Sequence, residues 1–100
     1  MNLTIERRQE IEGVIREVLK KKLSGVSINA VDIAPDFDEF GDPILRVKVI
    51  YKDQGKTPLQ GLSGLVRNIR PSLSRMQEER FPVMSFIASS EMEALKSEAH

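Results

Sequence analysis

Cysteine and tryptophan are absent from this 100-residue chain, and histidine occurs only once, as His100. The absence of cysteine excludes disulfides and thiolate metal sites. Without cysteine or an internal histidine, the chain lacks the most common nucleophiles, proton carriers and zinc ligands. The sequence therefore predicts no enzymatic activity, no metal site and no cofactor.

Long apolar runs are also missing. No stretch approaches the roughly 20 apolar residues that span a bilayer. The N-terminal segment, MNLTIERRQEIEG, has no apolar core of the kind found in secretory signals. We therefore expect a cytoplasmic protein with no membrane association. The length fits one domain, residues 1–100, whose last few residues we expect to be disordered.

The net charge is zero, but the charges are unevenly placed. Counting Lys and Arg against Asp and Glu, residues 1–25 carry +2, residues 26–42 carry −5, residues 43–80 carry +5 and residues 81–100 carry −2. Such asymmetry indicates an acidic partner for the basic segment, or only solvated faces. The zero total disfavours tight, sequence-independent binding of nucleic acid, which depends on accumulated positive charge.

The first part of the chain predicts a helix over residues 4–23. Thr4 is a suitable N-cap, and Gly25 is a suitable left-handed cap after the helix. The apolar residues recur three and four positions apart and form one stripe: Ile11, Val14, Ile15, Val18 and Leu19.

A second helix is predicted over residues 59–80. Its apolar seam has the same spacing and consists of Leu62, Val66, Ile69, Leu73 and Met76. Pro71 interrupts the seam, and an interior proline removes one backbone hydrogen bond. The sequence therefore predicts either one helix kinked at Pro71 or two short helices that meet there.

Two segments between these helices predict a β-hairpin. Residues 44–51 alternate strictly, which places Arg46 and Lys48 on the side opposite the apolar residues. Residues 26–34 are rich in β-branched residues but change phase midway, which indicates a bulge or burial on both faces. Residues 35–43 between the strands have the composition of a loop.

A third strand is predicted over residues 82–89, followed by a short helix that begins with the capping box Ser90 to Glu93. The order is then α-β-β-α-β-α. The third strand returns across a helix, so it should lie parallel to the second. We expect an α+β domain with two main helices on one face of a three-stranded mixed sheet. Such a sheet keeps two edges and one open face, which invite pairing with another chain.

These features predict a non-catalytic interaction module that binds a protein partner or itself. Phe37 and Phe40 lie in the acidic loop, where they either fold back onto the core or serve as aromatic anchors for a partner. We expect Arg46 and Lys48, on the polar side of their strand, to steer a partner electrostatically.

The alternative is an RNA-binding module. The sequence GLSG, with Gly61 and Gly64 at its ends, has the G-x-x-G pattern that clamps the nucleic-acid backbone in KH domains. The element order resembles the type II KH order if Pro71 splits the helix. That resemblance implies backbone contacts from the two glycines, with Arg67 and Arg70 nearby. At the start of a helix, the same glycines predict only a helix start with room for close packing.

Overall fold

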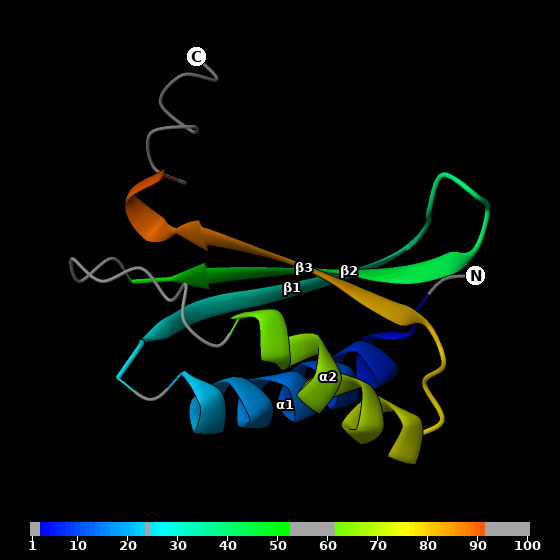
Figure 1. Cartoon of the computed structure of the whole chain (residues 1–100), viewed down its shortest axis with the longest axis horizontal. Coiled ribbons are helices and arrows are strands. Elements are labelled where there is room, and N and C mark those ends of the chain that lie inside the picture. Colours follow the sequence, from blue (N-terminus) through cyan, green and yellow to red (C-terminus); the bar gives the residue numbers. More distant parts are fainter. Residues whose placement is uncertain (1–2, 24, 53–61, 92–100) are drawn as a thin grey trace.

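The structure is a computed structural model that describes residues 3–23, 25–52 and 62–91 (Figure 1). A third helix begins at residues 89–91, at the end of the described part. The main elements are α1 (Ile5–Lys22), β1 (Ile28–Phe37), β2 (Pro43–Tyr51), α2 (Leu62–Arg75) and β3 (Phe81–Ala88). The order α-β-β-α-β-α confirms the predicted α+β class.

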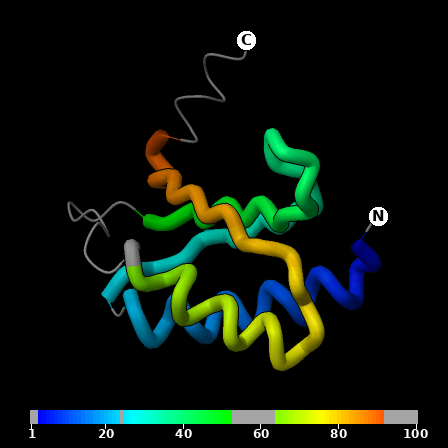
Figure 2. The backbone as a smooth tube through the Cα atoms, turned by 45° about the vertical axis from the view of Figure 1, so that its right-hand side comes forward, coloured from blue at the N-terminus to red at the C-terminus, as the bar shows by residue number. Residues whose placement is uncertain are grey.

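The three strands form one mixed sheet in the order β1-β2-β3. β1 pairs antiparallel with β2, and β3 pairs parallel with β2, as predicted. Both helices lie on the same face of the sheet in two views of the backbone (Figures 1 and 2). The molecule therefore has two layers, and β1 and β3 are the edge strands.

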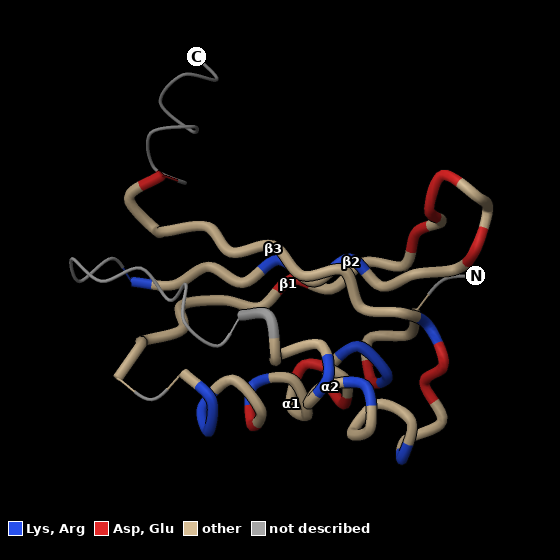
Figure 3. Tube along the Cα trace, viewed as in Figure 1, with Lys and Arg blue, Asp and Glu red and all other residues tan. Residues whose placement is uncertain are grey.

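The hairpin is longer than the sequence predicted. Residues 35–37, expected in the loop, continue β1, and Pro35 pairs with Leu45. Proline is tolerated there because β1 is an edge strand, which has one side without ladder partners. The connecting loop is therefore only residues 38–42, which carry three of the acidic residues (Figure 3).

The predicted phase change in the first strand is a β-bulge. The pairing register shifts between Ile28 and Ala30, so that two residues of β1 oppose one residue of β2. Beyond the bulge, Val31 and Ile33 point to the helices and are buried. The bulge thus lets the apolar residues of β1 reach the core after the change of phase.

The core lies between the helices and the inner face of the sheet. α1 contributes its predicted stripe, and β2 contributes every second residue. In α2 the fully buried line keeps Ile69 and Leu73 of the predicted seam, but Leu65 is buried in place of Val66, which is only half-buried. The fully buried apolar residues of these three elements are Ile11, Ile15, Leu19, Leu45, Val47, Val49, Leu65, Ile69 and Leu73.

Pro71 does not split α2. The helix runs without interruption from Leu62 to Arg75, and Pro71 lies on its exposed side. The solvent-facing position explains the tolerance, because water can hydrogen-bond the carbonyl group that the missing N–H leaves free. The split required by the resemblance to type II KH domains is therefore not present.

The N-cap of α1 is Thr4, as predicted, whereas its C-cap is Leu23 and not Gly25. The Oγ1 atom of Thr4 accepts a hydrogen bond of 3.0 Å from the backbone N–H of Arg7. The helix ends at Lys22, and the Leu23 N–H donates to the Leu19 carbonyl. Gly25 has φ +90°, a left-handed conformation that glycine adopts without the steric cost of a Cβ atom.

The end of α2 is a Schellman motif built on a residue other than glycine. The Glu78 N–H donates to the Leu73 carbonyl and the Gln77 N–H donates to the Ser74 carbonyl. Gln77 has φ +63°, in the left-handed region. For a residue with a Cβ atom, this conformation costs about 1–2 kcal/mol.

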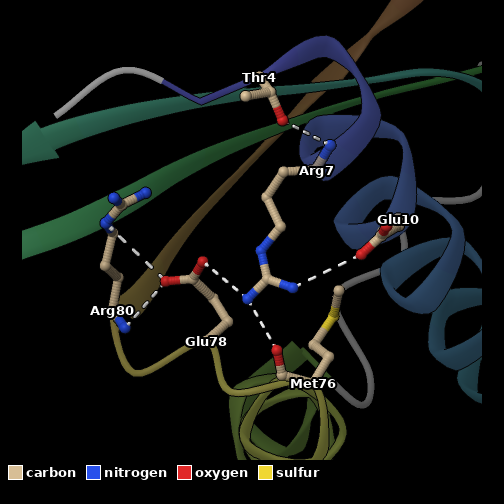
Figure 4. A network of polar contacts seen from close by, with 6 residues as sticks. All are labelled: Thr4, Arg7, Glu10, Met76, Glu78 and Arg80. Carbon is tan, nitrogen blue, oxygen red and sulfur yellow. Dashed lines mark hydrogen bonds and ion pairs between the residues drawn. The ribbon is translucent and has the colours of Figure 1, made fainter.

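A buried carboxylate joins the start of α1 to the start of β3 (Figure 4). Glu78 is 8% exposed, and its Oε1 atom lies 3.6 Å from Nη2 of Arg7. Its Oε2 atom lies 3.8 Å from Nε of Arg80 and accepts a hydrogen bond of 3.2 Å from the Arg80 backbone N–H. Arg7 also donates to the Met76 carbonyl, at 2.8 Å, and pairs with Glu10. These contacts fix the turn between α2 and β3.

Substitution Gln77→Gly should raise the free energy of unfolding by about 0.5–1 kcal/mol. Glycine removes the left-handed strain, and its greater freedom in the unfolded chain offsets part of the gain. Urea denaturation monitored by circular dichroism measures the change. Gln77→Ala keeps a Cβ atom and should give no such increase. Equal effects of the two substitutions would show that strain at Gln77 is not the cause.

Substitution Glu78→Ala should lower the free energy of unfolding by about 2–3 kcal/mol, because it leaves the Arg7 and Arg80 guanidinium groups without their buried partner. Glu79→Ala removes the neighbouring exposed carboxylate and should change stability by less than about 0.5 kcal/mol. Denaturation curves for the two variants provide the comparison. A loss at Glu78 no larger than that at Glu79 would contradict a structural role for the network.

Candidate interaction surface

The sheet has a second face, turned away from the helices, that no other described element covers (Figure 1). We call it the open face. Strand register and the alternation of side chains define its members. They are Ala30, Asp32, Ala34 and Asp36 from β1, Ile44, Arg46, Lys48 and Ile50 from β2, and Phe81, Val83, Ser85 and Ile87 from β3.

The open face consists of three parallel strips of different chemistry. β1 contributes the acids Asp32 and Asp36, and β2 contributes two exposed cations. β3 contributes apolar side chains, of which Phe81 is 44% exposed and Val83 is 38% exposed. Residues 81–90 contain no charged residue. The apolar strip therefore lies directly beside the basic one.

The two cations of the basic strip interact unequally with the acidic strip. The Arg46 Nε atom donates a short hydrogen bond to Oδ2 of Asp36 on the neighbouring strand. Lys48 lies opposite Asp32 in the register. No carboxylate among the described residues lies within ion-pair distance of Lys48. Lys48 is thus the more available cation of the open face.

The hydrogen bond from Arg46 lowers the pKa of Asp36 below its ordinary value of 3.8, and the backbone N–H of Phe37 lowers this pKa further. A carboxyl group with a lowered folded-state pKa stabilises the fold at pH values above its unfolded-state pKa. This contribution is lost as the pH falls through the folded-state pKa. The Asp36–Arg46 pair therefore persists at neutral pH.

The loop of residues 38–42 rises from the sheet on the side of the open face (Figures 1 and 2). Its conformation is fixed by Asp38, whose Oδ1 atom accepts hydrogen bonds from the backbone N–H groups of Phe40, at 2.9 Å, and Asp42, at 2.8 Å. Gly41, at φ +85°, supplies the left-handed position of the turn. Phe40 is 81% exposed at the tip of this ordered loop.

The predicted partner-binding residues do not form a single cluster. Arg46 and Lys48 lie on the open face, and the loop that carries Phe40 rises on the same side. Phe37 pairs with Pro43, so it has the same phase in β1 as the inward residues Val31 and Ile33 and does not belong to the open face. Its side chain is 59% exposed. The interpretation that the two phenylalanines fold back onto the core is wrong, because both are exposed.

The residues proposed for nucleic-acid binding are only partly together. Gly61 lies outside the described residues. Gly64 lies in the first turn of α2, where an added Cβ atom would meet only the Asn68 amide, at 3.9 Å. The helix start is thus confirmed, but close packing at Gly64 is not present. Arg67 and Arg70 are exposed on α2 and line one depression of about 350 Å³.

Three further residues of this region were not predicted as functional. Arg80 lines the same depression as the two α2 arginines, and its Nη1 atom is buried without a hydrogen-bond partner among the described residues. Phe81 and Val83 form part of the apolar strip, and the guanidinium group of Arg70 lies 5.1 Å from the Phe81 ring centroid. The feature of the sequence that pointed to Phe81 and Val83 is the uncharged run from residue 81 to residue 90, which is unusual for an edge strand.

A scan against known protein families, a search of curated proteins and a search of solved structures each found no match. No helix in the described part of the chain is both long and apolar enough to cross a lipid bilayer. Within the same residues, no group of three or more His, Cys, Asp or Glu side chains is placed to hold a metal ion.

Substitution Arg46→Gln should raise the pKa of Asp36 towards 3.8, because it removes the main interaction that favours the ionised carboxylate. A carbon-13 NMR titration of the side-chain carboxyl groups follows this pKa directly. Lys48→Gln removes one charge from the same strand without touching this hydrogen bond and should leave the pKa of Asp36 low. An equal shift in both variants would mean that general charge, and not the Asp36–Arg46 contact, sets the value.

Proposed function

We propose that this chain is a non-catalytic interaction module that binds another protein through its open face. The observation that carries the proposal is the apolar strip of Phe81, Val83 and Ile87 beside the exposed cations Arg46 and Lys48. Protein interfaces commonly have an apolar centre and a polar rim, and aromatic and arginine side chains are enriched among their strongest contacts. Apolar and basic strips in direct contact match that pattern.

Phe40 extends this surface in our proposal. The hydrogen bonds to Asp38 hold the loop in one conformation, so a partner that contacts Phe40 does not have to order the loop first. An exposed aromatic ring on an ordered loop is suited to act as an anchor. Phe37, which belongs to the other face of its strand, stays a predicted anchor that this surface does not include.

Self-association is the second form of the same proposal. Two copies of the chain can meet through the apolar strip of the open face, and the sheet also has free edges that can pair. The cytoplasmic location expected from the composition is also part of the proposal. A partner recovered from the cytoplasm and a dimer of the purified chain are distinguished by sedimentation of the chain alone.

Substitution Lys48→Glu should reduce the association rate with a co-purified protein partner by about 3- to 10-fold and leave the free energy of unfolding nearly unchanged. Lys48 is exposed and has no ion-pair partner among the described residues, so its charge contributes more to steering than to folding. Biolayer interferometry with the immobilised chain measures the rate, and thermal denaturation measures the stability.

Arg8→Glu is the matched control for this experiment. Arg8 is exposed on α1, on the opposite side of the molecule from the open face, and the net change in charge is the same. The control should bind at the rate of the unchanged chain. If Arg8→Glu slows association as much as Lys48→Glu does, long-range charge and not the open face governs binding, and the surface assignment is wrong.

RNA binding remains the second candidate because of one observation. Arg67, Arg70 and Arg80 line the same depression at the start of β3, together with Glu78 and Glu79, and guanidinium groups are suited to phosphate. Phosphate contacts make affinity fall steeply with salt, whereas an interface with an apolar centre is much less sensitive. A steep salt dependence of binding to single-stranded RNA would favour this candidate, and a weak dependence of partner binding favours the protein module.

A further inference from the structure

The two edges of the sheet are protected very differently. β1 has a bulge between Ile28 and Ala30, a proline at residue 35 and two acidic side chains that belong to the open face. These are the usual devices that prevent an edge strand from pairing with another chain. β3 has Pro82 near its start, but residues 83–88 contain no proline, no charge and no bulge in their pairing with β2. About 20 Å of strand is therefore unprotected.

The inner face of the sheet is also incompletely covered at β3. Val31 and Ile33 of β1 are buried under the helices. Met84 and Phe86, the corresponding inward residues of β3, are only half-buried although they pack against the core. No backbone hydrogen bond from the outer edge of β3 to another segment occurs among the described residues. A fourth strand at this edge would complete the cover of both side chains and the backbone ladder.

The depression at the start of this edge is lined by three arginines and two glutamates, Glu78 and Glu79, and two of the arginines have no ion-pair partner among the described residues. Arg67 and Arg70 are exposed on α2, and neither has a carboxylate within ion-pair distance in the described part of the chain. Arg80 shares their depression, and its buried Nη1 atom lacks a hydrogen-bond acceptor there. Glu78 already contacts Arg7 and Arg80 through its two oxygen atoms. Arg67 and Arg70 are therefore the groups that a carboxylate from outside can contact, because the Nη1 atom of Arg80 is closed to solvent.

We propose that the outer edge of β3 accepts an extended segment of a partner protein as a fourth strand, and that this segment carries an acidic side chain. The acidic side chain lies against Arg67 and Arg70, and the apolar residues that follow it cover Met84 and Phe86. The main chain supplies hydrogen bonds and the alternate side chains supply selectivity, as in other cases of strand addition. This inference rests on the proposed function and names the chemistry of the partner.

A second copy of the chain fits this edge less well. Residues 81–90 carry no charge, so a second β3 strand brings no carboxylate to the arginines. It would instead add the arginines of the second copy to the same extended sheet, and like charges repel. An acidic segment of another protein satisfies both the unpaired edge and the unpaired charge.

The test uses the whole chain and a library of random twelve-residue peptides displayed on phage. Peptides selected against the chain should be enriched in Asp or Glu near one end, with β-branched or aromatic residues alternating beyond it. In a complex with one selected synthetic peptide, alternate amides within residues 83–88 should exchange with solvent at least 10-fold more slowly. NMR of the nitrogen-15-labelled chain measures the exchange of each amide.

Two variants test the charge. Arg67→Glu should weaken the selected peptide at least 10-fold, whereas Arg75→Glu, the same change on the last turn of α2 and outside this depression, should weaken it less than 3-fold. Peptides that bind without changing exchange in residues 83–88, or without acidic enrichment and without loss in Arg67→Glu, would overturn the inference and leave the proposed function intact. A failure to select any peptide, or a dimer that buries β3, would also overturn it.

Discussion

The buried carboxylate of Glu78 is the contact on which the interaction surface depends. It lies between Arg7 at the start of α1 and Arg80 at the start of β3, and it follows a turn closed by Gln77 in a left-handed conformation. A buried charge is costly unless it is paired. The contacts of Glu78 with the two arginines therefore restrict the path of the chain from α2 to β3. The position of β3 in turn decides which side chains reach the open face and which arginines surround its edge.

The same constraint explains the asymmetry of the sheet. Two helices on one face bury Val31 and Ile33 at the middle of β1, but they leave Met84 and Phe86 at the middle of β3 half-exposed. Three of the four outward residues of β3, Phe81, Val83 and Ile87, are apolar as well, so this strand carries more apolar surface than the described fold covers. Surplus apolar surface on an edge strand is a risk for aggregation unless a partner occupies it. In our account, the partner is the reason for its presence.

The sequence predicted the parts of the fold that depend on local patterns. The strict alternation of residues 44–51 identified the central strand and both of its faces, and the phase change before Val31 indicated the bulge. The N-cap of α1 and the left-handed conformation after the helix followed from Thr4 and Gly25 because both depend on local chemistry, although the C-cap itself is Leu23. The extension of β1 through Pro35 was missed because composition alone does not show that a strand lies at the edge of a sheet.

The candidate site was less predictable because it depends on contacts between distant segments. Arg46 and Lys48 could be identified from the alternation of one strand, and Phe40 from its place in a loop. The assignment of Phe37 to the opposite face required the true end of β1. The meeting of Arg80 with Arg67 and Arg70 depends on the path between α2 and β3, which Glu78 fixes by contacts up to 71 residues away in sequence.

The most direct test of the account is affinity purification of the tagged chain from its native cell extract, with and without nuclease, at two salt concentrations. We expect a stoichiometric protein partner that persists after nuclease treatment and at the higher salt, because salt screens charge–charge interactions but does not weaken apolar contacts. Loss of all partners on nuclease treatment, with recovery of RNA from the untreated sample, would contradict the account and would favour RNA binding instead.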